Sequence, residues 1–132
     1  MADLTPLPAA TVTLVRDGPQ GLEVLMMKRN MQSAFVPGRY LFPGGSVDPA
    51  DGLADIYAHC AGLTDAAASR RLGLESGGLA YWIAAIRESF EESGLLLAHD
   101  ENNRQVTPEP EAELAHHRKA GARGEPVSRL VV

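Results

Sequence analysis

The chain of 132 residues has a single cysteine, Cys60. One cysteine cannot form an internal disulfide, and a zinc cage of cysteine and histidine needs more ligands than the chain offers. A reducing compartment is the simplest setting for such a sequence. We interpret Cys60 as a small buried residue rather than as a metal ligand or a nucleophile.

Basic side chains are also scarce, because 12 Lys and Arg stand against 17 Asp and Glu and give a formal net charge of −5. Without a basic stripe, the chain is not expected to bind nucleic acid. An acidic protein that handles a phosphate-bearing substrate must offset the repulsion locally. Bound divalent cations are the usual means.

The sequence shows no targeting or membrane-spanning segment. Residues 1–10 contain no basic stretch followed by an apolar run, as a signal peptide would. No apolar stretch approaches the ~20 residues needed to cross a bilayer. We therefore expect one cytoplasmic domain over residues 1–132, with no membrane partner.

Apolar and turn-forming residues predict a mixture of strands and helices. Strands are expected over 10–16 and 22–29, joined as a hairpin by the turn residues at 17–21. Residues 79–93 form the clearest helix, since glycines precede them and Gly94 follows as a C-terminal cap. Shorter strands are expected at 40–42, 95–98 and 130–132, and further helices at 53–60, 64–73 and 107–121.

Three carboxylates fall on one face of the predicted helix over 79–93. Glu88, Glu91 and Glu92 stand at i, i+3 and i+4, within a sector of about 100°. Arg87 is placed to hold a carboxylate by a forked hydrogen bond. The opposite side of the helix carries the apolar residues Leu79, Trp82, Ile83, Ile86 and Phe90.

Like charges at this spacing repel one another. A hard divalent cation relieves the repulsion, because Mg²⁺ and Mn²⁺ prefer oxygen ligands. The spacing alone leaves two interpretations open, a metal site and a solvated acidic helix face.

The stretch Arg87-Glu88-Ser89-Phe90-Glu91-Glu92-Ser93-Gly94-Leu95 resembles the core of the Nudix box, G-x5-E-x7-R-E-U-x-E-E-x-G-U with U apolar. Phe42-Pro43-Gly44-Gly45 resembles the strand and loop that open this box. Gly45 would be its first glycine. The chain thus resembles the Nudix hydrolases, and its long insertion resembles the branch that contains the coenzyme A diphosphatases.

Two departures from the standard box matter. Arg87 comes 42 positions after Gly45 instead of 14, which places an insertion of about 28 residues at about 46–78. Leu79 stands eight positions before Arg87, where the box has its middle glutamate. Asp51 keeps the spacing from the glycine and Glu75 lies nearer the helix, so both stay open as substitutes.

The resemblance implies an α/β fold, the Nudix α/β/α sandwich around a mixed β-sheet, incomplete at its C-terminal end. It also implies three sets of site residues. The ligands of Mg²⁺ or Mn²⁺ would be Glu88, Glu91, Glu92 and the carbonyl of Gly44, the catalytic residues would be Glu91, Glu92 and Arg87, and the substrate-binding residues would be Gly45, Arg39 and Tyr40.

The implied activity is metal-dependent hydrolysis of a diphosphate linkage in a nucleoside diphosphate derivative, with (acyl-)coenzyme A as the favoured substrate. A hydrolase of other nucleotide conjugates and a non-catalytic nucleotide-binding or regulatory domain are the alternatives. An incomplete sheet leaves an unpaired edge, so a homodimer is a further expectation.

Overall fold

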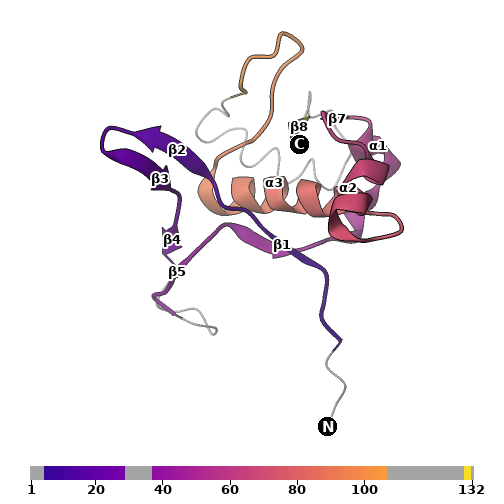
Figure 1. Ribbon diagram of the computed structural model, residues 1–132, viewed down its shortest axis with the longest axis horizontal. Coiled ribbons are helices and arrows are strands. Elements are labelled where there is room, and N and C mark those ends of the chain that lie inside the picture. Colours follow the sequence, from indigo (N-terminus) through magenta and orange to yellow (C-terminus); the bar gives the residue numbers. More distant parts are fainter. Residues whose placement is uncertain (1–4, 29–36, 107–129, 132) are drawn as a thin grey trace.

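Helix α3 (Leu79–Ser93) lies at the centre of the structure, and the other elements are arranged around it (Figure 1). The computed structural model describes residues 5–28 and 37–106, and the backbone of 130–131. Strands β1 (Ala9–Thr11) and β6 (Gly44–Ser46) run along one side of α3. The glycine pair that opens the expected Nudix box is therefore part of a strand that faces the helix.

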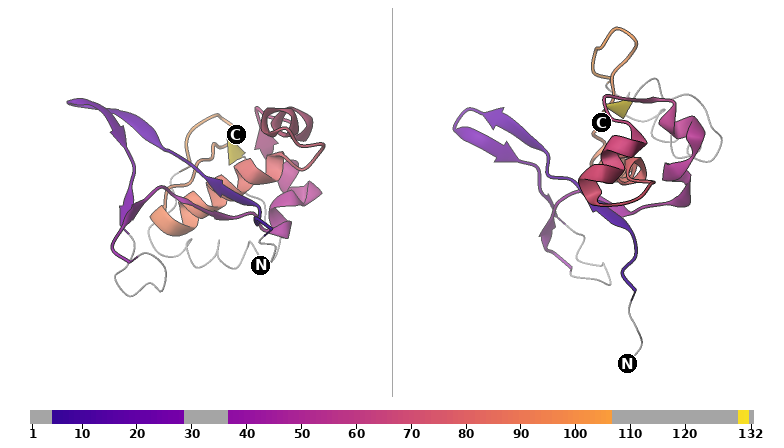
Figure 2. Two further views of the ribbon diagram at one scale, coloured as in Figure 1. Left: turned by 60° about the horizontal axis from the view of Figure 1, so that its bottom comes forward. Right: turned by 45° about the vertical axis from the view of Figure 1, so that its right-hand side comes forward.

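The described strands form two-stranded ladders rather than one continuous sheet. β1 pairs antiparallel with β6, and Ala10 lies opposite Gly45. The other pairs are the projecting hairpin of β2 (Val15–Gly18) and β3 (Gly21–Val24) seen in Figure 2, the antiparallel pair of β4 (Met27–Lys28) and β5 (Tyr40–Leu41), and the parallel pair of β7 (Cys60–Ala61) and β8 (Leu130–Val131).

The inserted segment packs against α3 instead of extending away from it. It holds the 3₁₀ helix η1 (Pro49–Gly52), α1 (Ala54–Tyr57), β7 and α2 (Asp65–Leu72). Helix α2 begins at an N-terminal Thr64 cap and ends at Gly73, whose φ of 70° suits glycine. Both η1 and α2 contact α3.

Helix α3 takes its N-terminal cap from the insertion. Its own cap residue, Gly78, has no side chain to offer. Instead, the Asp65 carboxylate accepts the N–H groups of Gly77 (3.0 Å) and Leu79 (2.9 Å). The Ser69 hydroxyl accepts the N–H of Gly78 at 2.9 Å. Three otherwise unpaired donors at this helix end are thereby satisfied.

The core lies on the apolar face of α3, as the sequence pattern predicts. Leu79, Ile83 and Ile86 are buried together with Ala68 of α2 and Ala98. Trp82 and Cys60 pack against this cluster while partly buried. Both residues therefore pack against the core, but Cys60, expected to be buried, is only partly so.

Helix positions are predicted better than strand positions. The helix over 79–93 is confirmed to the residue, and Gly94 ends it with a left-handed φ of 74°. The strand expected over 10–16 is divided into β1 and β2, and the helix expected over 53–60 is limited to α1. The helix expected over 107–121 lies outside the described residues.

The strand expected over 95–98 is wrong. Although Ala98 is buried, the chain turns back on itself just after it. The N–H of Val106 donates to the Ala98 carbonyl at 3.0 Å, and the N–H of Asp100 donates to the Arg104 carbonyl at 2.8 Å. Apolar residues here cover α3 through a local loop, so burial did not indicate a strand.

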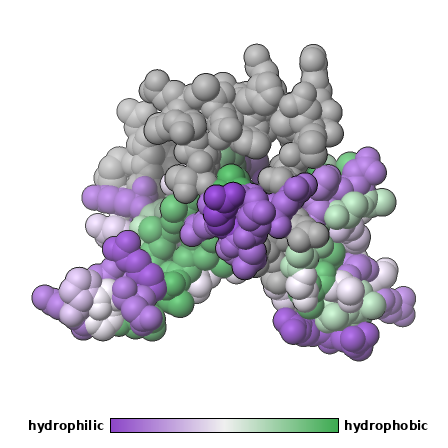
Figure 3. Space-filling model, turned by 90° about the horizontal axis from the view of Figure 1, so that it is seen from above, coloured by the Kyte–Doolittle hydropathy of each residue, from purple (hydrophilic) through white to green (hydrophobic). Residues whose placement is uncertain are grey.

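Several apolar side chains are exposed on the hairpin and near it. In the space-filling view, hydrophobic residues lie between two more hydrophilic projecting ends (Figure 3). The large exposed apolar residues include Val15, Leu22, Val24 and Leu95. In the part of the chain that the structure describes, no helix has both the length and the apolar character to cross a membrane.

Candidate active site

The carboxylates of α3 face the glycine pair of β6. The N–H of Gly44 donates to Glu92 Oε2 at 3.2 Å across 48 residues of sequence. Glu88 lies so close to Gly45 that a Cβ built on residue 45 would overlap the Glu88 carboxylate. Two of the three glutamates therefore contact the glycine pair of β6, which the sequence places at the opening of the Nudix box.

Arg87 is the centre of the polar contacts at this site. Its Nη1 donates to Glu88 Oε1 at 2.9 Å and to Glu91 Oε2 at 3.3 Å. Its Nη2 donates to the Ser46 carbonyl at 2.9 Å. The expected role of Arg87, to hold a carboxylate of the helix, agrees with these contacts.

Asp51 is the fourth partner of Arg87. Its Oδ1 accepts Arg87 Nε at 2.9 Å and its Oδ2 accepts Nη2 at 3.0 Å, which is the forked geometry of a strong charge-assisted pair. Asp51 Oδ2 also accepts the N–H of Asp48 at 2.8 Å, within a capping box at the start of η1. Only 3% of Asp51 is exposed.

The electrostatic environment differs among these groups. The hydrogen bond with Asp51 raises the pKa of Arg87 above its ordinary value, against the opposing effect of burial. Arg87 therefore carries its positive charge among several carboxylates at any relevant pH. The side chain of Glu88 is 16% exposed, whereas that of Glu91 is 47% exposed, so Glu91 is the more accessible to a ligand.

Asp51, not Glu75, is the carboxylate that reaches Arg87. Glu75 is exposed in the turn between α2 and α3. The sequence spacing left both residues open, and it could not choose between them because the contact joins positions 36 residues apart. The Asp48-x-x-Asp51 capping pattern is a local signal that could have fixed the place of Asp51.

The structure brings together only part of the predicted site. Among the described residues, no three His, Cys, Asp or Glu side chains form a group that could hold a metal ion as they stand. Tyr40 is 64% exposed on β5, with the Lys28 ammonium 6.0 Å from its ring centre, and Arg39 is exposed beside it. The substrate-binding role of Arg39 and Tyr40 stays a prediction.

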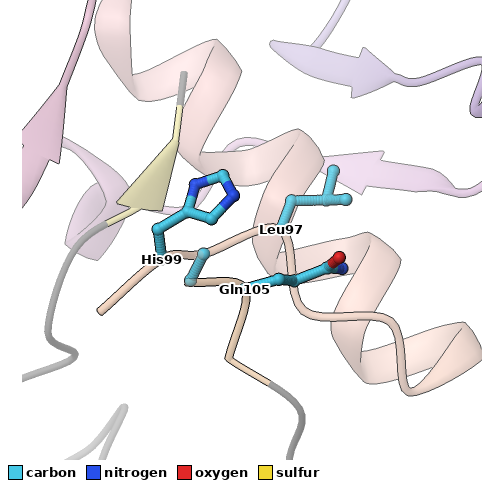
Figure 4. A pocket seen from close by; sticks show the side chains of 4 residues that line it. Leu97, His99 and Gln105 are labelled. Atoms are coloured by element: carbon cyan, nitrogen blue, oxygen red, sulfur yellow. The ribbon is translucent and has the colours of Figure 1, made fainter. Parts of the chain in front are cut away.

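A cavity of about 320 Å³ is formed by residues that come after α3 in the sequence. This cavity was not predicted from the sequence. It is lined by Leu97, Ala98, His99 and Gln105 from the loop after the helix (Figure 4). His99 Nδ1 is buried there without a hydrogen-bond partner among the described residues. No carboxylate of α3 lines this cavity, so it is distinct from the site around Gly44 and Gly45.

Comparison with known proteins finds relatives over part of the chain. No family model matches the chain. Acyl-coenzyme A diphosphatase NUDT19 of Xenopus laevis is 34% identical over 100 residues, which cover 61% of this chain and 26% of that protein. The protein of the same name from Homo sapiens is 32% identical over 101 residues, covering 59% and 27%. The chain thus spans about a quarter of the length of these curated relatives.

A solved structure supports the same relationship. The crystal structure of NUDIX hydrolase from Alicyclobacillus acidocaldarius matches with a TM-score of 0.65 and 29% sequence identity, over 93% of this chain and 57% of that one. The expected α/β Nudix fold is thereby confirmed. In sequence and in structure the chain is thus similar to Nudix hydrolases, among them proteins named acyl-coenzyme A diphosphatase.

Proposed function

We propose that this chain hydrolyses a diphosphate linkage in a nucleoside diphosphate derivative, with the help of divalent cations held at α3. The observation that carries the proposal is the placement of Glu88 and Glu92 against Gly44 and Gly45 of β6, beside Arg87. A solvated acidic helix face would not need these contacts across the fold. The fold and the relatives support the same reaction class.

The donor atoms fit a hard cation. Carboxylate and carbonyl oxygens are the ligands that Mg²⁺ and Mn²⁺ prefer. We assign Glu88, Glu91, Glu92 and the Gly44 carbonyl as the ligands. Glu91 must turn away from Arg87 to join them, and its exposure leaves it free to do so. A bound cation would neutralise the diphosphate oxygens and acidify a water molecule.

The side chains around the cation site have different proposed roles in the reaction. Arg87 holds Glu88 in place through a hydrogen bond of 2.9 Å. Glu91 or Glu92 accepts the proton of the attacking water. The activities of Glu91→Gln and Glu92→Gln distinguish the two residues. Gly45 leaves room for the Glu88 carboxylate. In this proposal, Arg39 and Tyr40 contact the substrate. Water attack on one phosphorus releases two phosphomonoesters.

We propose (acyl-)coenzyme A as the substrate. Three of the relatives carry the name acyl-coenzyme A diphosphatase, and the insertion between Gly45 and Arg87 resembles that branch. Cleavage of the coenzyme A diphosphate gives a phosphopantetheine and an adenosine bisphosphate. Sugar nucleotides and dinucleoside polyphosphates are the competing substrates.

The test is a panel of these substrates with Mg²⁺ or Mn²⁺, scored for phosphomonoester products. Glu91→Gln and Glu92→Gln are compared with Glu75→Gln, which removes an exposed carboxylate outside the site. We expect Glu75→Gln to retain activity and at least one of the α3 variants to lose it. Equal turnover by Glu91→Gln would remove Glu91 from the mechanism.

A non-catalytic nucleotide-binding domain is the second candidate. Leu79 stands where the standard box has its middle glutamate. Among the described residues, no three His, Cys, Asp or Glu side chains are grouped so that they could hold a metal ion. No turnover on any substrate, together with nucleotide binding, would favour this candidate.

Homodimerisation and a cytoplasmic location also stay predictions. Two-stranded ladders leave strand edges without a neighbour within the described residues, which permits pairing between copies. A monomer mass in light scattering would contradict the dimer.

A further inference from the structure

The exposed face of the β2–β3 hairpin and the β4–β5 ladder is apolar. Burial alternates at every position from Leu22 to Lys28, where the even-numbered residues are exposed and the odd-numbered ones partly buried. In an extended chain, such alternation places every second side chain on the same face. The register puts Val15 opposite Val24 and Tyr40 opposite Lys28, so these partners share that face. Its six apolar residues, which we call the apolar face, are Val15, Leu22, Val24, Met26, Tyr40 and Phe42.

The described part of the structure leaves the apolar face uncovered. The exposed fraction of its residues ranges from 40% for Met26 to 68% for Leu22. The hairpin projects from the rest of the fold (Figure 2), and among the described elements β2 and β3 have extensive contacts only with each other. An isolated two-stranded hairpin is only marginally stable in water. Exposed apolar residues that lie together commonly mark a site of association, so a partner on this face would stabilise the hairpin.

Two charges of opposite sign lie at the two ends of the apolar face. Asp17 lies opposite Leu22 at the tip of the hairpin. Lys28 lies at the far end, with its ammonium 6.0 Å from the ring centre of Tyr40. Within the described residues, neither Asp17 nor Lys28 forms an ion pair. Residues 22–28 span ~20 Å when extended, so the two charges are well separated and each can meet a partner outside the chain.

We propose that the apolar face is the interface of a two-fold homodimer, in which two copies pack face to face with their hairpins antiparallel. A surface that pairs with a copy of itself must be complementary to itself under the two-fold rotation. End-for-end packing meets this condition, because it brings Asp17 of each copy to Lys28 of the other and apolar residues against apolar residues. Side chains make these contacts, whereas pairing of strand edges would use backbone groups. The inference is independent of the proposed hydrolysis.

Sedimentation equilibrium of the full chain measures the dissociation constant of the dimer. We expect Leu22→Glu to raise this constant at least about tenfold, because it buries an unpaired carboxylate in the interface. The matched control is Leu53→Glu, the same change at a leucine that is 55% exposed in the insertion. It should alter the constant less than about twofold, because Leu53 lies outside the apolar face.

Charge reversal tests the end-for-end arrangement. Asp17→Lys and Lys28→Asp each replace attraction by repulsion at both of the equivalent contacts, so each should raise the dissociation constant about tenfold at low salt. The double variant restores opposite charges at both contacts and should return the constant to within about threefold of the original. Both residues are exposed, so neither change disturbs the core.

Weakening of the dimer by Leu22→Glu, together with recovery in the charge-swapped double variant, supports the proposal. A monomer at every concentration up to about 1 mM overturns it. A dimer that responds equally to Leu22→Glu and Leu53→Glu, or to neither, has its interface elsewhere and overturns it as well. Single charge reversals without effect, a double variant that does not recover, or assembly beyond the dimer would each overturn the two-fold antiparallel pairing.

Discussion

Gly45 and Glu88 lie in direct contact, since a Cβ on residue 45 would overlap the Glu88 carboxylate. The two residues are far apart in sequence, and the ladder between β1 and β6 holds Gly45 in this place. The glycine is needed here for close approach. Its lack of a side chain lets an acidic helix face come up against the backbone of a strand.

Gly45→Ala is therefore expected to displace Glu88 and to abolish most of the proposed activity. Overpacking of this kind commonly costs about 1–3 kcal/mol of unfolding free energy. Gly52→Ala is the control, because a Cβ at residue 52 meets nothing within 4 Å. Activity and urea unfolding of both variants test this, and an active Gly45→Ala would show that Glu88 does not need its present position.

Asp65 should make the stability of the chain depend on pH. The N–H groups of Leu79 and Gly77 hold the pKa of Asp65 below its ordinary value of 3.8. A carboxyl with a lower pKa in the folded state than in the unfolded state stabilises the fold above the unfolded value. That contribution is lost as the pH falls through the folded value.

Asp65→Asn replaces one acceptor oxygen by an amide that cannot accept a hydrogen bond. At neutral pH, we expect it to lower the unfolding free energy by about 1 kcal/mol. The difference from the unchanged chain should shrink below about pH 4, where the carboxylate of the unchanged chain becomes protonated. Urea unfolding at several pH values measures this. A difference that stays constant down to pH 2 would contradict the account of the cap.

Ser69→Ala should destabilise the fold without removing a site residue. Ser69 is 1% exposed, and its hydroxyl accepts the N–H of Gly78. Loss of that acceptor leaves a buried donor unpaired, at a cost of about 1–3 kcal/mol. Ser76→Ala, in the exposed turn before α3, should cost less than about 0.5 kcal/mol. Similar unfolding midpoints for the two variants would contradict this prediction.

Local signals in the sequence were sufficient to predict helix α3 and its acidic face. Gly94 marks the end of the helix, and the spacing of Glu88, Glu91 and Glu92 is a property of a few adjacent turns. The strand expected over 95–98 failed because burial against a helix and pairing in a sheet require the same apolar residues. Periodicity alone cannot tell these two outcomes apart.

The contacts that the sequence could not predict are those between distant segments. Arg87 meets Asp51 across 36 positions, and Leu79 meets Asp65 across 14. Both partners lie between Gly45 and Arg87, where only Asp51 keeps a spacing of the family pattern. Their roles depend on how η1 and α2 pack against α3. The spacing of residues along the chain does not predict that packing.

The most direct test of the central claim is to measure Mn²⁺ binding to Glu88→Gln and Glu92→Gln by electron paramagnetic resonance. The unchanged chain and Glu75→Gln should bind Mn²⁺ with equal affinity, and each α3 variant should bind at least about tenfold more weakly. Equal binding by all four proteins, or no binding by the unchanged chain, would contradict the assignment of the α3 glutamates as cation ligands.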